Sequence, residues 1–268
     1  MNRDERYVSI LLKPLETCLD YKPKFGQGNK CGLTLSDFRQ LYHEDIFYSW
    51  LGLDSPLLYT AHRVAGGMTS LYRQIGLGCE SLFRTILCDE YLFQESDAKW
   101  SYKIVQSNGK IGTLSLDGRI IIDKIQNKDK KELIVDWLIR IGKELSIERK
   151  VLSALQGVVF EVRQGYKSKD SKRQNADINN ATNAYAHGYL PCVLMMSNQI
   201  DTDLITRYKN AKWAILEGKM IPSPYSSSYS FMKEIVGYNL EQFFVRNSNL
   251  LKEKVHEVVA QLLSVEKI

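Results

Sequence analysis

The C-terminal half of the chain alternates short apolar segments with segments of helical period, and this alternation constrains the fold most strongly. Residues 157–164, 190–197 and 213–217 predict strands, and residues 171–187 and 201–210 predict helices between them. Strands separated by helices are joined by crossover connections, which favour parallel pairing within one sheet. We therefore expect at least part of the sheet to be parallel, with helices packed against it.

Residues 100–125 have a different period. Their β-branched side chains alternate, and two turn signals, Asn108-Gly109 and Asp117-Gly118, interrupt them. This pattern predicts a three-stranded antiparallel meander that leads into the parallel strands. The expected fold class is α/β, with a mixed central β-sheet (antiparallel meander plus parallel crossover strands) flanked by helices.

The preceding segments have helical periods. Residues 1–60 are helical and irregular in pattern, and the Gly66-Gly67 pair predicts a break before a helix that contains Gly76 and Gly78. We interpret Gly76 and Gly78 as places where another segment packs closely. No linker divides the sequence, so we expect a single domain over residues 1–268. Its parts are a helical N-terminal part (1–65), a catalytic core (66–217) and a C-terminal loop and helix for core packing or dimerisation (218–268).

Composition and charge argue against several classes of protein. No apolar run approaches the roughly 18–20 residues that span a bilayer, so we expect no membrane partner. Acids among the first charged residues argue against a secretory signal, so we expect a cytoplasmic protein. Five cysteines without a CxxC pair and four scattered histidines argue against zinc sites and a disulfide framework. The formal net charge of +5 favours anionic partners.

The strand predicted from the sequence VVFEVRQG carries charge where a buried strand should be apolar. Because side chains two residues apart share a face, Val159, Glu161 and Arg163 lie on one face of this strand. A carboxylate inside a sheet is costly unless a cation meets it. The alternative is an edge strand that holds Glu161 in water.

Basic and amide side chains follow this strand directly. Asparagine is a middling helix former, so several in one helix are costly unless they are used; a solvated polar face is the alternative. Lysine and arginine reach phosphates, and asparagine and glutamine pair with adenine in the major groove. The residues that we expect to contact DNA are Lys167, Lys169, Lys172, Arg173, Gln174, Asn175, Asn179, Asn180 and Asn183.

The order of strand, Glu-x-Arg, basic loop, helix, strand, helix and strand resembles the PD-(D/E)XK nuclease superfamily. The polar run after the motif and the segment YLPCVLMMSNQID resemble type II restriction endonucleases in particular. The resemblance covers residues 111–217 and, more loosely, residues 66–90. It implies a restriction-endonuclease-like fold in which Glu161 and an aspartate of the preceding strand bind Mg²⁺. It also puts Arg163 at the position of a lysine that orients or deprotonates the attacking water.

An arginine at the lysine position is a departure from the family, because arginine stays protonated and cannot act as a base. Either Lys167 or Lys169 supplies the amine, or the metal-bound water loses its proton without that help, or the site is inactive. The aspartate is open between Asp117, whose Leu-Asp-Gly resembles the family's Pro-Asp-Gly, and Asp123 at the far end of the same predicted strand. Asp117 is alternatively the first residue of an Asp-Gly turn.

Two further features bear on the metal ligands. Both aspartates lie farther before Glu161 than is usual in the family, because the helical segment 128–155 intervenes. Family members often add an acid from an earlier helix, and Glu80 would occupy that place; an ordinary helix-surface glutamate is the alternative. The candidate catalytic residues are Asp117, Asp123, Glu161, Arg163, Lys167 and Lys169, and the candidate metal ligands are Asp117, Asp123, Glu161 and Glu80.

The resemblance implies a Mg²⁺-dependent, site-specific endonuclease of double-stranded DNA, that is, a type II restriction enzyme of a restriction-modification system. A palindromic target would favour a homodimer. One alternative is a repair or resolvase-like nuclease that selects DNA structure. Another is a catalytically inactive DNA-binding protein with a degenerate nuclease fold. The last is an unrelated α/β protein in which Glu161 and Arg163 form an internal ion pair.

Overall fold

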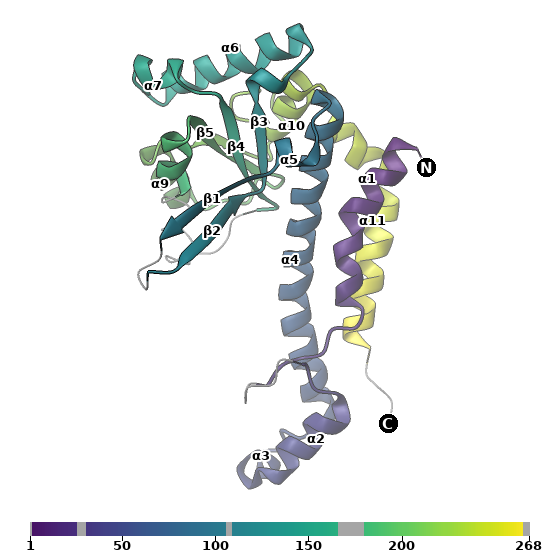
Figure 1. Ribbon diagram of the computed structural model, residues 1–268. Helices are drawn as coiled ribbons and strands as arrows, with labels where there is room; N and C mark the ends of the chain where they lie inside the picture. Colours follow the sequence, from purple (N-terminus) through teal and green to yellow (C-terminus); the bar gives the residue numbers. More distant parts are fainter. Residues whose placement is uncertain (1, 26–30, 106–108, 166–179, 265–268) are drawn as a thin grey trace. The chain divides into compact units, whose positions relative to one another are not determined.

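Figure 1 shows the computed structural model of the chain, which describes residues 2–25, 31–105, 109–165 and 180–264. The chain divides into two compact units. The first, here called the helical unit, comprises Met1–Gly78 and Arg246–Ile268, and the second, the sheet unit, comprises Cys79–Val245. The fold mixes helices and strands around a mixed sheet, as the sequence predicts. Within the described residues, no helix is long and apolar enough to cross a membrane.

Helices and short turns build the described part of the helical unit. Its elements are α1 (Arg3–Leu12), η1 (Lys13–Cys18), α2 (Leu35–Glu44), α3 (Ile46–Trp50), the first part of α4 (Pro56–Tyr91) and most of α11 (Leu240–Leu263). A capping box begins α1, in which the side chain of Asn2 accepts from the amide of Glu5 and the side chain of Glu5 accepts from the amide of Asn2. A core cluster joins the two ends of the sequence, with Leu71 of α4 packed near Leu262 of α11.

The glycine pair Gly66-Gly67 lies inside α4, so the predicted break is wrong. A Cβ at Gly66 would overlap the hydroxyl oxygen of Tyr21, and a Cβ at Gly67 would overlap the side chain of Leu262. Each glycine costs a helix about 1 kcal/mol relative to alanine. Close packing of the neighbouring segments offsets that cost, which a local sequence pattern does not reveal.

The sheet unit contains the remaining strands and helices. Its helical elements after α4 are α5 (Glu95–Ala98), η2 (Ile122–Lys124), α6 (Lys128–Glu144), α7 (Arg149–Ser153), α9 (Thr202–Asn210), α10 (Ser228–Phe231) and η3 (Met232–Val236), and residues 180–186 are also helical. Its strands are β1 (Trp100–Val105), β2 (Ile111–Leu116), β3 (Gly118–Ile121), β4 (Gly157–Arg163), β5 (Tyr189–Met195) and β6 (Ala214–Leu216). The three strands predicted in the C-terminal half are thus confirmed as β4, β5 and β6.

The four-stranded sheet has the order β3-β4-β5-β6, with β3 antiparallel to β4 and the other pairs parallel. The mixed sheet with crossover connections is confirmed. The three-stranded meander is wrong in its third strand: β1 and β2 pair as a separate two-stranded sheet, and β3 joins β4 instead. Asp117-Gly118 is therefore a passage between two sheets and not a hairpin turn. Figure 1 shows the β1–β2 hairpin extending away from the four-stranded sheet.

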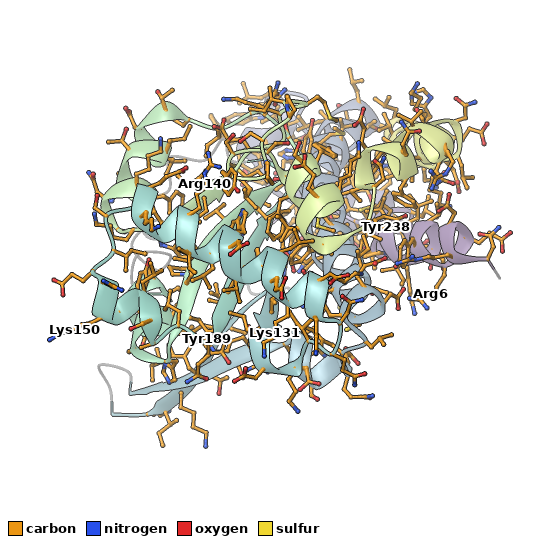
Figure 2. The ribbon with its side chains drawn as sticks, turned by 90° about the horizontal axis from the view of Figure 1, so that it is seen from above. Arg6, Lys131, Arg140, Lys150, Tyr189 and Tyr238 are labelled. Carbon is orange, nitrogen blue, oxygen red and sulfur yellow. The ribbon has the colours of Figure 1, made fainter. Side chains whose placement is uncertain are left out.

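Apolar side chains cover both faces of the four-stranded sheet. On one face, Val159 and Val193 belong to a core cluster with Trp100 and Tyr102 of β1 and Trp213 before β6. On the other face, Phe160 contacts Phe83 of α4 and Phe231 of α10 (ring centroids 5.0 and 5.7 Å apart). β4 is therefore an interior strand buried on both sides. Figure 2, which looks down on the ribbon, shows Lys150 of α7 projecting outward at the edge of the unit.

Candidate active site

Asp117 connects β2 to β3 and is bound to β4 on both sides of Glu161. Its amide donates to the carbonyl oxygen of Phe160, and its Oδ2 accepts from the amide of Val162, both at 2.8 Å. The register of β3 and β4 pairs Gly118 with Phe160, which sets the preceding residue beside Glu161. A carboxylate that accepts a backbone N–H bond is held in a fixed orientation. The passage between the two sheets thus places Asp117 next to Glu161 across the pair of strands.

Helix α4 adds a third carboxyl. Glu80 forms a side-chain hydrogen bond with Asp117. Nη1 of Arg84 donates to the carbonyl oxygen of Asp117 at 2.6 Å. Residues four apart lie on the same face of a helix, so Glu80 and Arg84 reach Asp117 together. Two carboxyl groups can share a hydrogen bond only while one of them keeps its proton.

The proton in this pair is assigned to Glu80. Burial, and next the negative charge of Asp117, raise the pKa of Glu80 to about 7. Burial also raises the pKa of Asp117, whereas the amide of Val162 and the charges of Arg163 and Arg84 lower it. The hydrogen bond between the two carboxyls raises the pKa of Glu80 and lowers that of Asp117. Glu80 therefore keeps its proton to a higher pH than an exposed glutamate does.

Glu161 and Arg163 form an ion pair on the sheet, between Oε1 and Nη2. Their side chains are 9% and 12% exposed, respectively, so the pair is largely shielded from water. The alternative of an edge strand with Glu161 in water is contradicted, because β4 lies between β3 and β5. The charge of Arg163 also lowers the pKa of Glu80 and of Asp117. This guanidinium therefore acts on all three carboxyls, and we call Glu80, Arg84, Asp117, Glu161 and Arg163 the acid–arginine cluster.

The donor chemistry of the cluster suits a hard divalent cation in part. Mg²⁺ takes oxygen ligands and is commonly held by one or two carboxylates, with water in its other positions. The Glu80–Asp117 pair supplies two such ligands, and Glu161 is engaged with Arg163. In the described ranges, no group of three or more His, Cys, Asp or Glu is arranged to hold a metal ion. The residues present therefore fit a cation held by a pair of carboxylates.

Asp123 does not join the cluster. It lies beyond the far end of β3, in η2, where its carboxylate pairs with Nζ of Lys131 at 3.0 Å. The side chain of Asp123 is 88% exposed. The structure thus separates two aspartates that the sequence left equal, because only Asp117 lies beside Glu161.

The amide residues expected to read DNA are placed only in part. Asn180 is buried and its Oδ1 accepts from the hydroxyl of Tyr102, and Asn183 also hydrogen-bonds Tyr102. These hydrogen bonds connect the helical residues 180–186 to β1. Because Asn180 is buried, its side chain is not exposed for contact with the edge of a base. The other expected DNA contacts lie outside the described residues: Lys167, Lys169, Lys172, Arg173, Gln174, Asn175 and Asn179.

Arg84 was not among the site residues expected from the sequence. The signal was present in the spacing, since Arg84 follows Glu80 by four residues and lies one helical turn away on the same face. A spacing of this kind occurs on most helices and does not by itself indicate a site. The contact of Arg84 with Asp117 in the folded chain is what assigns Glu80 and Arg84 to the site.

Comparisons with known proteins add no relative. No family model matches the chain, and neither the curated proteins nor the solved structures contain a match to it.

Proposed function

We propose that the chain is a Mg²⁺-dependent, site-specific endonuclease of double-stranded DNA, of the type II restriction kind, with its active site at the acid–arginine cluster. One observation carries the proposal: Asp117 is hydrogen-bonded to β4 on both sides of Glu161 while its carboxylate bonds Glu80. Strand β4, the passage before β3 and helix α4 thus bring three carboxyls and two arginines to one place. This is the constellation that the resemblance to PD-(D/E)XK nucleases leads us to expect.

Each residue has a role that its surroundings support. Asp117 and Glu80 would hold the cation, and Glu80 would release its proton on binding, which its raised pKa permits near neutral pH. A bound Mg²⁺ supplies activation of the attacking water and neutralisation of charge on the scissile phosphate. Arg163 carries a permanent charge that stabilises negative charge on the phosphate, and it cannot accept a proton. Lys167 and Lys169 remain the candidates for a nearby amine.

The unrelated α/β protein with an internal Glu161–Arg163 ion pair is the competing interpretation, and the observed pair favours it. That interpretation explains two of the five residues of the cluster. It leaves the Glu80–Asp117 pair without a purpose, although burial and repulsion by the charge of Asp117 make the ionisation of Glu80 unfavourable. A cation site explains the pair, because the cation would relieve this repulsion.

The test is incubation of the purified protein with phage DNA in Mg²⁺, with and without EDTA, followed by electrophoresis. Discrete bands that EDTA abolishes are the expected result, and sequencing of the ends then gives the site and the stagger of the cut. A smear would favour a nuclease that selects DNA structure, or one that cuts DNA without specificity. Intact DNA in both Mg²⁺ and Mn²⁺, with a target site known to be present, would contradict the proposal.

Oligomeric state belongs to the same proposal. If the cut sites are palindromic, two copies related by a two-fold axis would place one acid–arginine cluster on each strand. We therefore expect a homodimer at cleavage, and sedimentation of the protein bound to a cut-site duplex measures it.

A further inference from the structure

The two faces of the β1–β2 hairpin have opposite characters. Alternation along the strands puts Trp100 and Tyr102 on one face, where both are buried in the core cluster of the sheet unit. The opposite face carries the cross-strand pairs Ser101–Ser115 and Lys103–Thr113. All four of these side chains are exposed. We call this second face, together with the 71% exposed Ile111 beside it, the polar ribbon face.

The polar ribbon face has a composition suited to a polyanion. Residues 100–116 contain Lys103 and Lys110 and no acid at all. Within the described residues, no side-chain hydrogen bond or ion pair is found for Ser101, Lys103, Thr113 or Ser115. Short hydroxyl side chains allow a close approach by a partner, and each can both donate and accept a hydrogen bond.

The hairpin is also joined directly to the acid–arginine cluster. β2 ends at Leu116 and the next residue is Asp117, so Ser115 lies two residues from the proposed cation ligand. A partner that lies along the polar ribbon face therefore passes close to Asp117. A two-stranded β-ribbon fits the major groove of duplex DNA, where serine and threonine bond base edges and a threonine methyl contacts that of thymine.

We propose that the polar ribbon face is the sequence-reading element of this protein and that its occupant is the major groove of duplex DNA. The inference rests on the proposed function and deepens it, because it moves base reading from the asparagine residues to Lys103, Thr113 and Ser115. Thr113 and Ser115 bond base edges, and Lys103 binds a phosphate or a guanine.

Strand geometry limits where the recognised bases lie. A strand rises about 3.4 Å per residue, and the bases of one DNA strand are also spaced by about 3.4 Å. The polar ribbon face therefore spans roughly six base pairs, and neighbouring side chains on it stand about two base pairs apart. Because the ribbon ends at Asp117, the recognised base pairs lie within roughly six pairs of the cut phosphate.

The experiment compares the whole protein with the variants Lys103→Ala, Thr113→Val and Ser115→Ala. Valine keeps the shape and strand preference of threonine, so Thr113→Val removes the hydroxyl while preserving the ribbon. Lys150→Ala is the matched charge control, because Lys150 is exposed on α7 and projects away from the unit (Figure 2). Far-ultraviolet circular dichroism verifies that each variant is folded. The probes are phage DNA for cleavage in Mg²⁺ and a pool of randomised duplexes for binding in EDTA.

The expected result is a loss of roughly tenfold in discrimination between sites for Thr113→Val and Ser115→Ala. Lys103→Ala should lower the slope of log affinity against log salt by about one, and Lys150→Ala should change neither quantity. Site-specific cutting by all variants at unchanged sites and rates would overturn the inference and leave the proposed function intact. Recognised base pairs more than about one helical turn, or ten pairs, from the cut would also overturn it.

The remaining outcomes separate the inference from the proposed function. If the protein cuts no DNA but binds the duplex pool, and the three ribbon variants lose that binding, the inference stands and the proposed function fails. If the protein neither cuts nor binds duplex DNA, both fail. The ribbon variants could instead change the sedimentation of the free protein without changing its affinity for DNA. That result would assign the polar ribbon face to contacts between copies of the chain and would overturn the inference.

Discussion

The raised pKa of Glu80 predicts that the stability of the sheet unit falls as pH rises. A glutamate has an ordinary pKa of 4.5, and burial and Asp117 raise that of Glu80 to about 7. Below 4.5 the residue is protonated in both folded and unfolded states and has no effect on stability. Between 4.5 and about 7 the unfolded state loses its proton first, so the free energy of unfolding decreases with pH. Above about 7 the loss is complete.

The magnitude follows from the separation of the two pKa values. At about 1.4 kcal/mol for each pH unit, the interval from 4.5 to about 7 corresponds to about 3.5 kcal/mol. Glu80 is only partly buried, so solvent screening reduces this figure to about 1–2 kcal/mol. We expect the free energy of unfolding of Glu80→Gln to exceed that of the natural protein by about 1–2 kcal/mol at about pH 8. Near pH 4 the two free energies of unfolding should be nearly equal.

Urea unfolding followed by tryptophan fluorescence measures this difference. Trp100, Trp137 and Trp213 are buried in the sheet unit and report on its unfolding. Trp50 lies in the helical unit and is already 81% exposed, so it contributes little change. Other groups titrate over the same pH range, and the comparison of the natural protein with the variant cancels their effects.

A control and a metal titration complete this test. Glu132→Gln, an exposed glutamate of α6, should leave the pH dependence unchanged. Mg²⁺ at ten times its dissociation constant should stabilise the natural protein by about 1.4 kcal/mol at about pH 8, and should stabilise Glu80→Gln much less. An identical pH dependence in the natural protein and in Glu80→Gln would refute the assignment of the proton to Glu80.

Two further predictions concern stability. Arg163→Gln removes the cation that pairs with the buried Glu161, so it should lower the free energy of unfolding by about 3 kcal/mol. Adding Glu161→Gln to this variant should recover most of the loss, because no buried charge is then left unpaired. Equal urea midpoints for the single and double variants would contradict the ion pair. Gly78→Ala should destabilise the helical unit by about 1–3 kcal/mol, because the new Cβ would overlap the carbonyl oxygen of Leu11. Gly76→Ala is its matched control and should stabilise by up to about 1 kcal/mol, because a Cβ there meets nothing within 4 Å. Thermal unfolding measures both glycine variants, and a stabilised Gly78→Ala would show that the packing is misassigned.

Hydrophobic patterns predicted the centre of the fold because they report burial directly. β4 and β5 are nearly continuous apolar runs, and an interior parallel strand requires such a run on both faces. The same patterns failed where two parts of the chain meet. Gly66 and Gly67 resemble a break in isolation, and only the segments packed against them explain why α4 continues.

The candidate site was predictable as a set of residue types and not as a set of contacts. Glu161 stood out because a charge in an apolar strand needs compensation, and its partner Arg163 was two residues away. Asp117 and Asp123 were equivalent in sequence, since an Asp-Gly pair predicts a turn and the strand pairing alone decides otherwise. Glu80 and Arg84 lie on a helix far away in the sequence, so their contact with Asp117 depends on tertiary packing.

The central claim is that the acid–arginine cluster around Asp117 is the catalytic site, and one pair of variants tests it most directly. Asp117→Asn and Asp123→Asn make the same chemical change near opposite ends of β3, inside the cluster and outside it. The measurement is the rate of cleavage of a duplex that contains the cut site, with variant in excess over DNA. We predict that Asp117→Asn abolishes cleavage while Asp123→Asn cuts at the rate of the natural protein. Full activity in Asp117→Asn would contradict the account.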